Sequence, residues 1–171
     1  MTRDDLIRII ERREEGRAKQ DQEILSEVRE QLLELLSLYP DDAEINYQMG
    51  IAYDNSGLGD KAIPYYVRAI ELGLSGADLE RCLMGLGSTY RYWGQYDKAV
   101  ATLRRGMKEF PENRAIQVFL AMALYNSHSY KESVELLIAN LMESTTDEKL
   151  HYFKRGINYY KENLDETAEN E

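Results

Sequence analysis

Apolar residues recur every three or four positions along most of the chain, which is the spacing of helices with one buried face. Between residues 83 and 107 these positions are Leu83, Leu86, Tyr90, Val100, Leu103 and Met107. Trp93-Gly94-Gln95 interrupts the pattern, and Pro111 ends it, because proline lacks the backbone donor that a continuing helix needs. The segment is therefore predicted to form a hairpin of two helices joined by a short turn.

This pattern is repeated along the chain. Met49-Gly50-Ile51-Ala52-Tyr53 is matched 37 residues later by Leu86-Gly87-Ser88-Thr89-Tyr90. A third, weaker copy follows after another 34 residues, with Leu120 in the place of Leu86. Repeats of this length form supersecondary units that stack and share a continuous core. The sequence therefore predicts an array of stacked helical hairpins.

The residues within each copy resemble the tetratricopeptide repeat (TPR) family, whose signature combines Leu-Gly, Tyr, Ala, an aromatic residue and Pro at fixed spacings. The second copy supplies Leu83, Leu86, Gly87, Tyr90, Ala99, Leu103 and Pro111; the first supplies Asn46, Met49, Gly50, Tyr53, Ala62 and Tyr66; the degenerate third supplies Gln117, Leu120, Ala121, Leu124, Ser133 and Leu137. The resemblance covers residues 43 to about 145. It implies an all-α fold, a solenoid or superhelix of antiparallel hairpins, with about nine helices in the whole chain.

One domain over residues 1–171 is expected, and the pattern divides it into successive units. These are a divergent N-terminal helical hairpin over 1–40, repeats over 43–76, 80–113 and 114–145, a C-terminal capping helix over 147–162, and an acidic tail over 163–171. Residues 3–38 fit either two helices with a turn near Gly16 or one long helix, and the pattern does not decide between them.

Charge and composition exclude several classes of function. The chain has 31 Asp and Glu against 21 Lys and Arg, a formal net charge of -10, which disfavours binding to nucleic acid or to anionic membranes. Its longest strictly apolar run, Val118 to Tyr125, is too short to span a bilayer, and the first residues contain no apolar signal core. A cytoplasmic location is therefore expected.

No group of residues indicates catalysis. The only histidines, His128 and His151, lie in different predicted segments, and the single cysteine, Cys82, is expected to be a packed thiol. Gly85-Leu86-Gly87 lies inside a predicted helix rather than after a strand, so it does not indicate a phosphate site. We therefore expect no enzyme, no cofactor and no metal.

The resemblance implies a binding surface, because in TPR proteins the first helix of each hairpin lines the concave face of the superhelix. The residues left on these helices after the packing positions are removed are rich in aromatic side chains, Met and Arg, as protein interfaces are. They form the candidate peptide-binding groove: Tyr47, Gln48, Ile51, Asn55, Arg81, Met84, Ser88, Arg91, Tyr92, Phe119, Met122, Tyr125 and Asn126. The function expected is a non-enzymatic adaptor or scaffold that binds a protein or peptide.

Two alternatives remain at this point, and one TPR function is disfavoured. The groove of a self-associating homo-oligomer would hold the acidic tail of its own or a neighbouring chain, and a signalling-peptide sensor would bind a regulatory peptide. TPR proteins that bind the acidic tails of chaperones carry a carboxylate clamp of Lys, Asn and Arg. The matching places here hold Tyr47, Ile51, Gly85, Ala115 and Phe119, which lack the charge for such a clamp.

Overall fold

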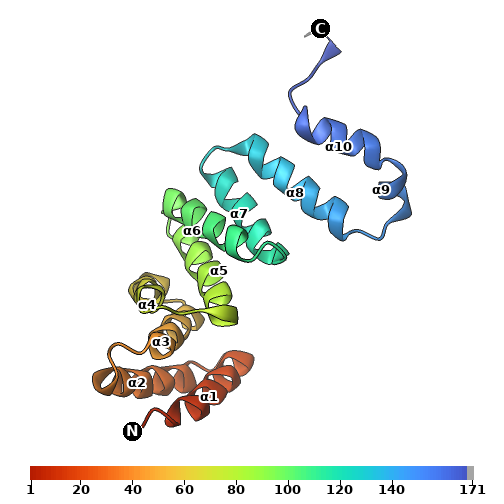
Figure 1. The fold of residues 1–171 in the computed structure, drawn as a ribbon. Helices are drawn as coiled ribbons and strands as arrows, with labels where there is room; N and C mark the ends of the chain where they lie inside the picture. The colour runs from red at the N-terminus through yellow and green to blue at the C-terminus, as the bar shows by residue number, and fades with distance from the viewer. Residues whose placement is uncertain (169–171) are drawn as a thin grey trace.

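Helices stack in sequence along the molecule, as a computed structural model that describes residues 1–168 shows (Figure 1). The described residues form ten helices: α1 (Asp5–Lys19), α2 (Gln22–Leu38), α3 (Ala43–Asn55), α4 (Gly59–Glu71), α5 (Gly76–Tyr92), α6 (Tyr96–Glu109), α7 (Arg114–Asn126), α8 (Tyr130–Ser144), α9 (Glu148–Tyr152) and α10 (Lys154–Glu162). Helices α1 to α8 pair into four hairpins, and neighbouring hairpins pack on one another. The all-α, TPR-like fold predicted from the sequence is confirmed.

The N-terminal segment is two helices rather than one. The break is at Gln20, whose backbone is left-handed (φ 54°), and the next residue, Asp21, caps α2 by accepting from the N–H groups of Glu23 and Ile24. Gly16 lies in the last turns of α1, where a Cβ would be 2.7 Å from the Cγ2 of Ile24. The absent side chain therefore lets α2 fold back closely against α1.

Glycine also sets the distance between helices within the first two TPR hairpins. A Cβ on Gly50 of α3 would lie 2.5 Å from the ring of Tyr66 in α4, and one on Gly87 of α5 would overlap Leu103 in α6. Tyr66 and Leu103 are both almost fully buried. The small residue on one helix and the large residue on the other therefore interlock, which explains the residue types at these repeat positions.

Two polar residues stand where the second hairpin has the apolar Leu83. Asn46 donates from its amide to the carbonyl of Pro40 at 3.0 Å, and Gln117 donates to that of Pro111 at 2.7 Å. Each amide fixes the loop that precedes its hairpin. Unlike the loops before Asn46 and Gln117, the loop before Leu83, Gly73-Leu74-Ser75-Gly76, contains no proline.

The core runs as two adjoining clusters through the stack. The first joins α1, α2 and α3 through Leu6, Ile9, Ile24, Val28, Leu32, Leu35, Ile45, Met49 and Ala52. The second joins α3 to α7 and includes Tyr47, Tyr66, Cys82, Leu86, Leu103, Ile116, Leu120 and Leu124. Helix α3 contributes to both, so the divergent N-terminal hairpin is continuous with the repeats.

The C-terminal segment differs from the single capping helix expected over 147–162. It divides at Phe153 into α9 and α10, and neither helix contains a buried residue. Helix α10 packs on α8, where Lys154, Asn158 and Lys161 line a cleft with Met142. The side chains of Phe153 and Tyr160 are 62% and 61% exposed, whereas Ile157, Asn158 and Lys161 are half-buried.

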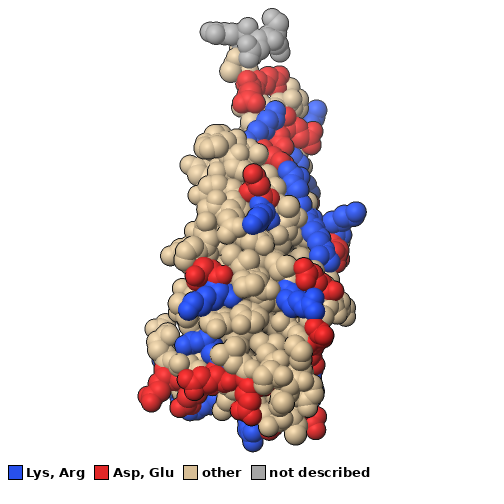
Figure 2. Space-filling model, turned by 90° about the vertical axis from the view of Figure 1, so that its left-hand side faces the viewer, with Lys and Arg blue, Asp and Glu red and all other residues tan. Residues whose placement is uncertain are grey.

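The acidic tail begins beside these helices. Asp165 lies 3.5 Å from the ammonium of Lys131 at the start of α8, and Glu166 accepts from the hydroxyl of Tyr159 at 2.9 Å. The last part of the predicted tail, residues 169–171, lies outside the described residues. On the face of the molecule shown in Figure 2, uncharged surface covers much of the middle, and acidic side chains gather at the N-terminal end.

Candidate functional site

The residues predicted for the groove lie on α3, α5 and α7, the first helices of the three TPR hairpins, but their exposure differs widely. Buried are Tyr47 and Gln48; half-buried are Ile51, Asn55, Met84, Ser88, Arg91, Phe119 and Asn126; exposed are Arg81, Tyr92, Met122 and Tyr125. The exposed part of the predicted set therefore belongs to α5 and α7.

Tyr47 and Gln48 are part of the interior. Tyr47 is 3% exposed, its ring centroid lies 6.3 Å from that of Tyr66, and burial raises the pKa of its hydroxyl. Gln48 accepts a hydrogen bond from the guanidinium of Arg13 on α1, which also pairs with Glu14 at 2.5 Å. Tyr47 therefore belongs to the core cluster shared with α4 and α5, the N-terminal hairpin contacts Gln48, and neither side chain is presented to a ligand.

The two arginines of the predicted groove have partners within the chain. Arg81 is mostly exposed and lies 3.5 Å from Asp78, one turn earlier on the same helix. Arg91 donates to the amide oxygen of Asn126 at 3.2 Å and so links α5 to α7. Arg91 therefore contributes to the contact between two hairpins in addition to lining their surface.

The remaining side chains form an apolar surface on α5 and α7 that we call the aromatic face: Tyr92, Met122 and Tyr125, with Met84 and Phe119. Tyr92 is 82% exposed, Tyr125 is 62% exposed and Met122 is 38% exposed. Met84 and Phe119 are half-buried and pack against the core. Tyr125 also contacts Tyr130 of α8 edge to face, with ring centroids 5.3 Å apart. Exposed aromatic and Met side chains over a packed apolar layer are characteristic of protein-binding surfaces.

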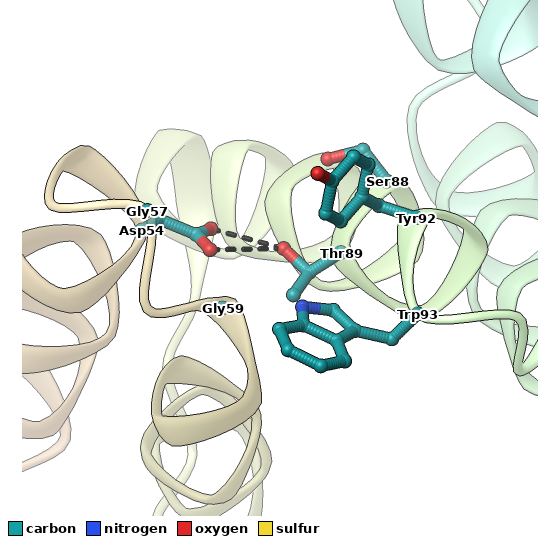
Figure 3. Close-up of a pocket in the computed structure, with 7 residues that line it drawn as sticks. All are labelled: Asp54, Gly57, Gly59, Ser88, Thr89, Tyr92 and Trp93. Atoms are coloured by element: carbon teal, nitrogen blue, oxygen red, sulfur yellow. Dashed lines mark hydrogen bonds between the residues drawn. The ribbon is translucent and has the colours of Figure 1, made fainter.

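A small cavity lies beside the aromatic face, between the first and second TPR hairpins. It has a volume of about 280 Å³ and is lined by Asp54, Gly57, Gly59, Ser88, Thr89, Tyr92 and Trp93 (Figure 3). Asp54 comes from the end of α3, the glycines from the turn into α4, and the other four from the end of α5. We call this cavity the inter-repeat pocket.

Asp54 is held in place by hydroxyl groups from two helices. Tyr66 of α4 donates to its Oδ2 at 2.8 Å, and the Oγ1 of Thr89 on α5 lies 3.0 and 3.1 Å from its two oxygens. Burial raises the pKa of this carboxyl, and the two hydrogen bonds, which act in the opposite direction, only partly offset burial. Asp54 therefore joins two hairpins through neutral partners.

Of the residues that line this pocket, the groove predicted from the sequence contains Ser88 and Tyr92 but not Asp54, Thr89 or Trp93. Trp93 follows α5 at the predicted turn, and its indole lies against the start of α4, where a Cβ on Gly59 would be 2.7 Å from its Nε1. The available signal was an aromatic pair, Tyr92-Trp93, at a turn that otherwise needs only small or polar residues.

Cys82 is packed in the interior, as predicted, and the two histidines lie apart on the surface. Cys82 is fully buried near the carbonyl of Tyr66, and burial raises the pKa of its thiol to about 12. His128 and His151 are exposed, at the turn before α8 and in α9. Within residues 1–168, no three His, Cys, Asp or Glu side chains are grouped closely enough to hold a metal ion.

Comparison with known proteins agrees with the repeat pattern. The family described as Tetratrico peptide repeat matches residues 43–164. The chain belongs to the tetratricopeptide repeat family. None of the curated protein sequences matches it.

A solved TPR-like structure shares the fold. The chain described as "MamA RS-1 ArsTM double mutant" superposes with a TM-score of 0.67, at 19% sequence identity, over 90% of this chain and 84% of that one. At this identity the likeness extends to the fold alone. No helix in the described part of this TPR chain combines the length and the apolar character needed to cross a membrane.

Proposed function

We propose that this TPR protein is a non-enzymatic adaptor that binds a protein or peptide on the aromatic face of α5 and α7. The observation that carries the proposal is the exposure of Tyr92 and Tyr125, 82% and 62%, on the first helices of two adjacent hairpins. Large aromatic side chains contribute most of the binding energy at many protein interfaces, and they bury large areas at little entropic cost. A cytoplasmic location is part of this proposal.

The stack itself supports a binding role for this face. Met84 and Phe119 anchor the aromatic face by packing against the core. The hydrogen bond from Arg91 to Asn126 joins α5 and α7, the two helices that carry this face. A surface held by packed side chains is already organised before a ligand arrives, which lowers the entropic cost of binding. The aromatic face therefore has the properties of a preformed site.

The test compares partner capture by the wild type and by a variant that carries Tyr92→Ser and Tyr125→Ser. A matched control carries Tyr152→Ser and Tyr160→Ser, which remove two equally exposed tyrosines, 83% and 61%, from outside the aromatic face. Each tagged protein is incubated with a peptide library displayed on phage and with its native lysate, after circular dichroism confirms that it is folded.

The expected result is that the wild type and the control enrich the same peptides or protein, and that the aromatic-face variant loses them. Retention by all three proteins, or loss from the control alone, would refute the assignment of the site. Fractionation of cells that produce the tagged protein tests its location.

A second candidate function, self-association, is favoured by one observation on the third hairpin. Val134, Leu137 and Leu141 follow one face of α8 and are 40%, 41% and 48% exposed. Their counterparts 34 residues earlier, Val100, Leu103 and Met107, are half-buried or buried in the core cluster that joins α3 to α7. This face thus has the apolar character of a contact between hairpins, and a second copy of the chain is the partner we assign to it.

Light scattering after gel filtration tests this second candidate. The wild type is expected to elute with twice the chain mass of 19.9 kDa, and Leu137→Glu is expected to elute as a monomer. Leu33→Glu, an exposed leucine on α2 with 45% exposure, is the control that leaves the mass unchanged. A monomeric wild type over the accessible concentration range would refute self-association.

A further inference from the structure

The inter-repeat pocket contains a carboxylate with no cationic partner. In the described part of the chain, residues 1–168, no Lys, Arg or His nitrogen lies within 4.0 Å of Asp54. Other acidic residues, Asp41 and Asp42 in the loop before α3 and Asp78 on α5, each pair with an arginine. Among the described residues, the side-chain oxygens of Asp54 accept hydrogen bonds only from the hydroxyls of Tyr66 and Thr89. A half-buried carboxylate in this state has lost part of its hydration without gaining a compensating charge.

Two aromatic rings line the same pocket as this carboxylate. Tyr92 and Trp93 extend from the end of α5 on either side of Thr89, which lies next to the oxygens of Asp54 (Figure 3). Their ring centroids are 6.2 Å apart and the rings are nearly perpendicular, at 78°. An organic cation between an aromatic face and a carboxylate gains both cation–π attraction and charge pairing.

The pocket is not a general consequence of stacking two hairpins. The repeat offset of 37 residues places Arg91 at the position of Asp54, and the offset of 34 residues places Ala123 and Ser127 at those of Thr89 and Trp93. The junction between the second and third hairpins therefore packs without an acid, a threonine hydroxyl or a tryptophan at these places. The set at the first junction is an addition to what the fold requires.

We propose that the inter-repeat pocket binds the cationic side chain, lysine or arginine, of a protein or peptide held on the aromatic face. The cavity, about 280 Å³, is smaller than the roughly 300–1,000 Å³ of sites that enclose a whole drug-sized ligand, so it suits the end of one side chain. Tyr92 belongs to both surfaces, and a chain lying on α5 and α7 therefore passes the mouth of the pocket. The inference rests on the proposed function and adds a charge requirement to the partner.

Trp93 allows the pocket to be studied alone, because it is the only tryptophan in the chain. In a proton–nitrogen correlation spectrum of the full-length protein, its indole N–H gives one cross-peak in a separate region. The probes are Nα-acetyl-lysine methylamide and Nα-acetyl-arginine methylamide, titrated at constant ionic strength. Nα-acetyl-norleucine methylamide, which keeps the aliphatic stem of lysine and lacks its charge, is the matched neutral probe.

The lysine or arginine probe is expected to move the cross-peak along a saturating curve, and the norleucine probe is expected to leave it in place. Asp54→Asn should weaken binding about tenfold, the effect of removing a charge pair inside a desolvated site. Asp97→Asn, which neutralises an exposed acid on α6, should leave the affinity unchanged. Equal binding of the norleucine probe, or unchanged affinity in Asp54→Asn, would overturn the proposal.

A second pocket variant, a quaternary amine probe and a variant outside the pocket complete the test. If Asp54→Asn does not fold, Tyr92→Leu replaces an exposed ring without disturbing the core and is expected to reduce the affinity several-fold; no reduction would overturn the proposal. Saturable binding of tetramethylammonium without binding of either amino-acid probe would also overturn it, in favour of a free quaternary amine. Tyr125→Ser, which lies outside the pocket, should retain probe binding while losing a partner of the aromatic face, so failure of the pocket and failure of the adaptor function are distinguishable.

Discussion

Gly87→Ala tests how closely the two helices of the second hairpin approach each other. The added Cβ would overlap the Cγ of Leu103 and lie 2.7 and 3.1 Å from its two methyl carbons. Leu103 is fully buried, so it cannot turn aside without disturbing Leu86 and Ile116, which belong to the same cluster. Overpacking of this kind costs about 1–3 kcal/mol, and three close atoms place it near the upper value. The better helix propensity of Ala offsets about 1 kcal/mol.

The net destabilisation expected for Gly87→Ala is therefore about 2 kcal/mol, or a fall of roughly 4–8 °C in the midpoint of thermal unfolding. Circular dichroism at 222 nm during heating measures the midpoint. Gly85→Ala is the matched control on the same helix, since its Cβ would meet only the hydroxyl end of Tyr66, at 3.3 Å. Its midpoint should stay within about 3 °C of the wild type. A Gly87→Ala variant as stable as the wild type would refute the close approach.

Three other predictions concern single residues. Pro64 is exposed in the second turn of α4, where it removes one hydrogen bond, so Pro64→Ala should raise the free energy of unfolding by about 2 kcal/mol in urea titrations; no increase would mean that the ring has an unrecognised packing role. Burial raises the folded-state pKa of Asp54, so the folded state binds more protons than the unfolded one, and wild-type stability should decline as pH rises above the ordinary value of 3.8. The free energy of unfolding of Asp54→Asn, measured over the same pH range, should not show this decline. Parallel curves for the two proteins would contradict the prediction. Because burial raises the pKa of the Cys82 thiol to about 12, its reaction with a disulfide reagent at pH 8 should be slow in the folded protein and fast in denaturant, and equal rates would contradict its burial.

The order and pairing of the repeat helices were predictable from the sequence. Gly50, Gly87 and their large partners on the second helices are local signals, because small and large residues must alternate where two helices interlock. The break at Gln20 was not decided by the pattern, since a left-handed residue other than glycine leaves no clear mark in the sequence. The division at Phe153 was missed because the apolar spacing continues through it.

The candidate groove was predicted only in part. Its exposed members on α5 and α7 follow from the spacing of the first helices. Tyr47 is instead buried against Tyr66 of α4, and Gln48 accepts a hydrogen bond from Arg13 of the preceding hairpin. Arg13, which contacts Gln48, is charged and would ordinarily be placed on the surface. The pocket combines residues from two hairpins, and such a combination depends on how the hairpins stack rather than on the pattern within either of them.

The weak attachment of α10 has a consequence for local unfolding. Helices α9 and α10 contain no buried residue. Within the described residues, α8 is the helix of the TPR hairpins against which α10 packs. In a linear array each unit is stabilised by its neighbours, so an end unit with one small contact opens at a much lower free energy than the middle of the array. Amide hydrogens of residues 154–162 should therefore exchange with solvent far sooner than those of α5, without unfolding of the aromatic face.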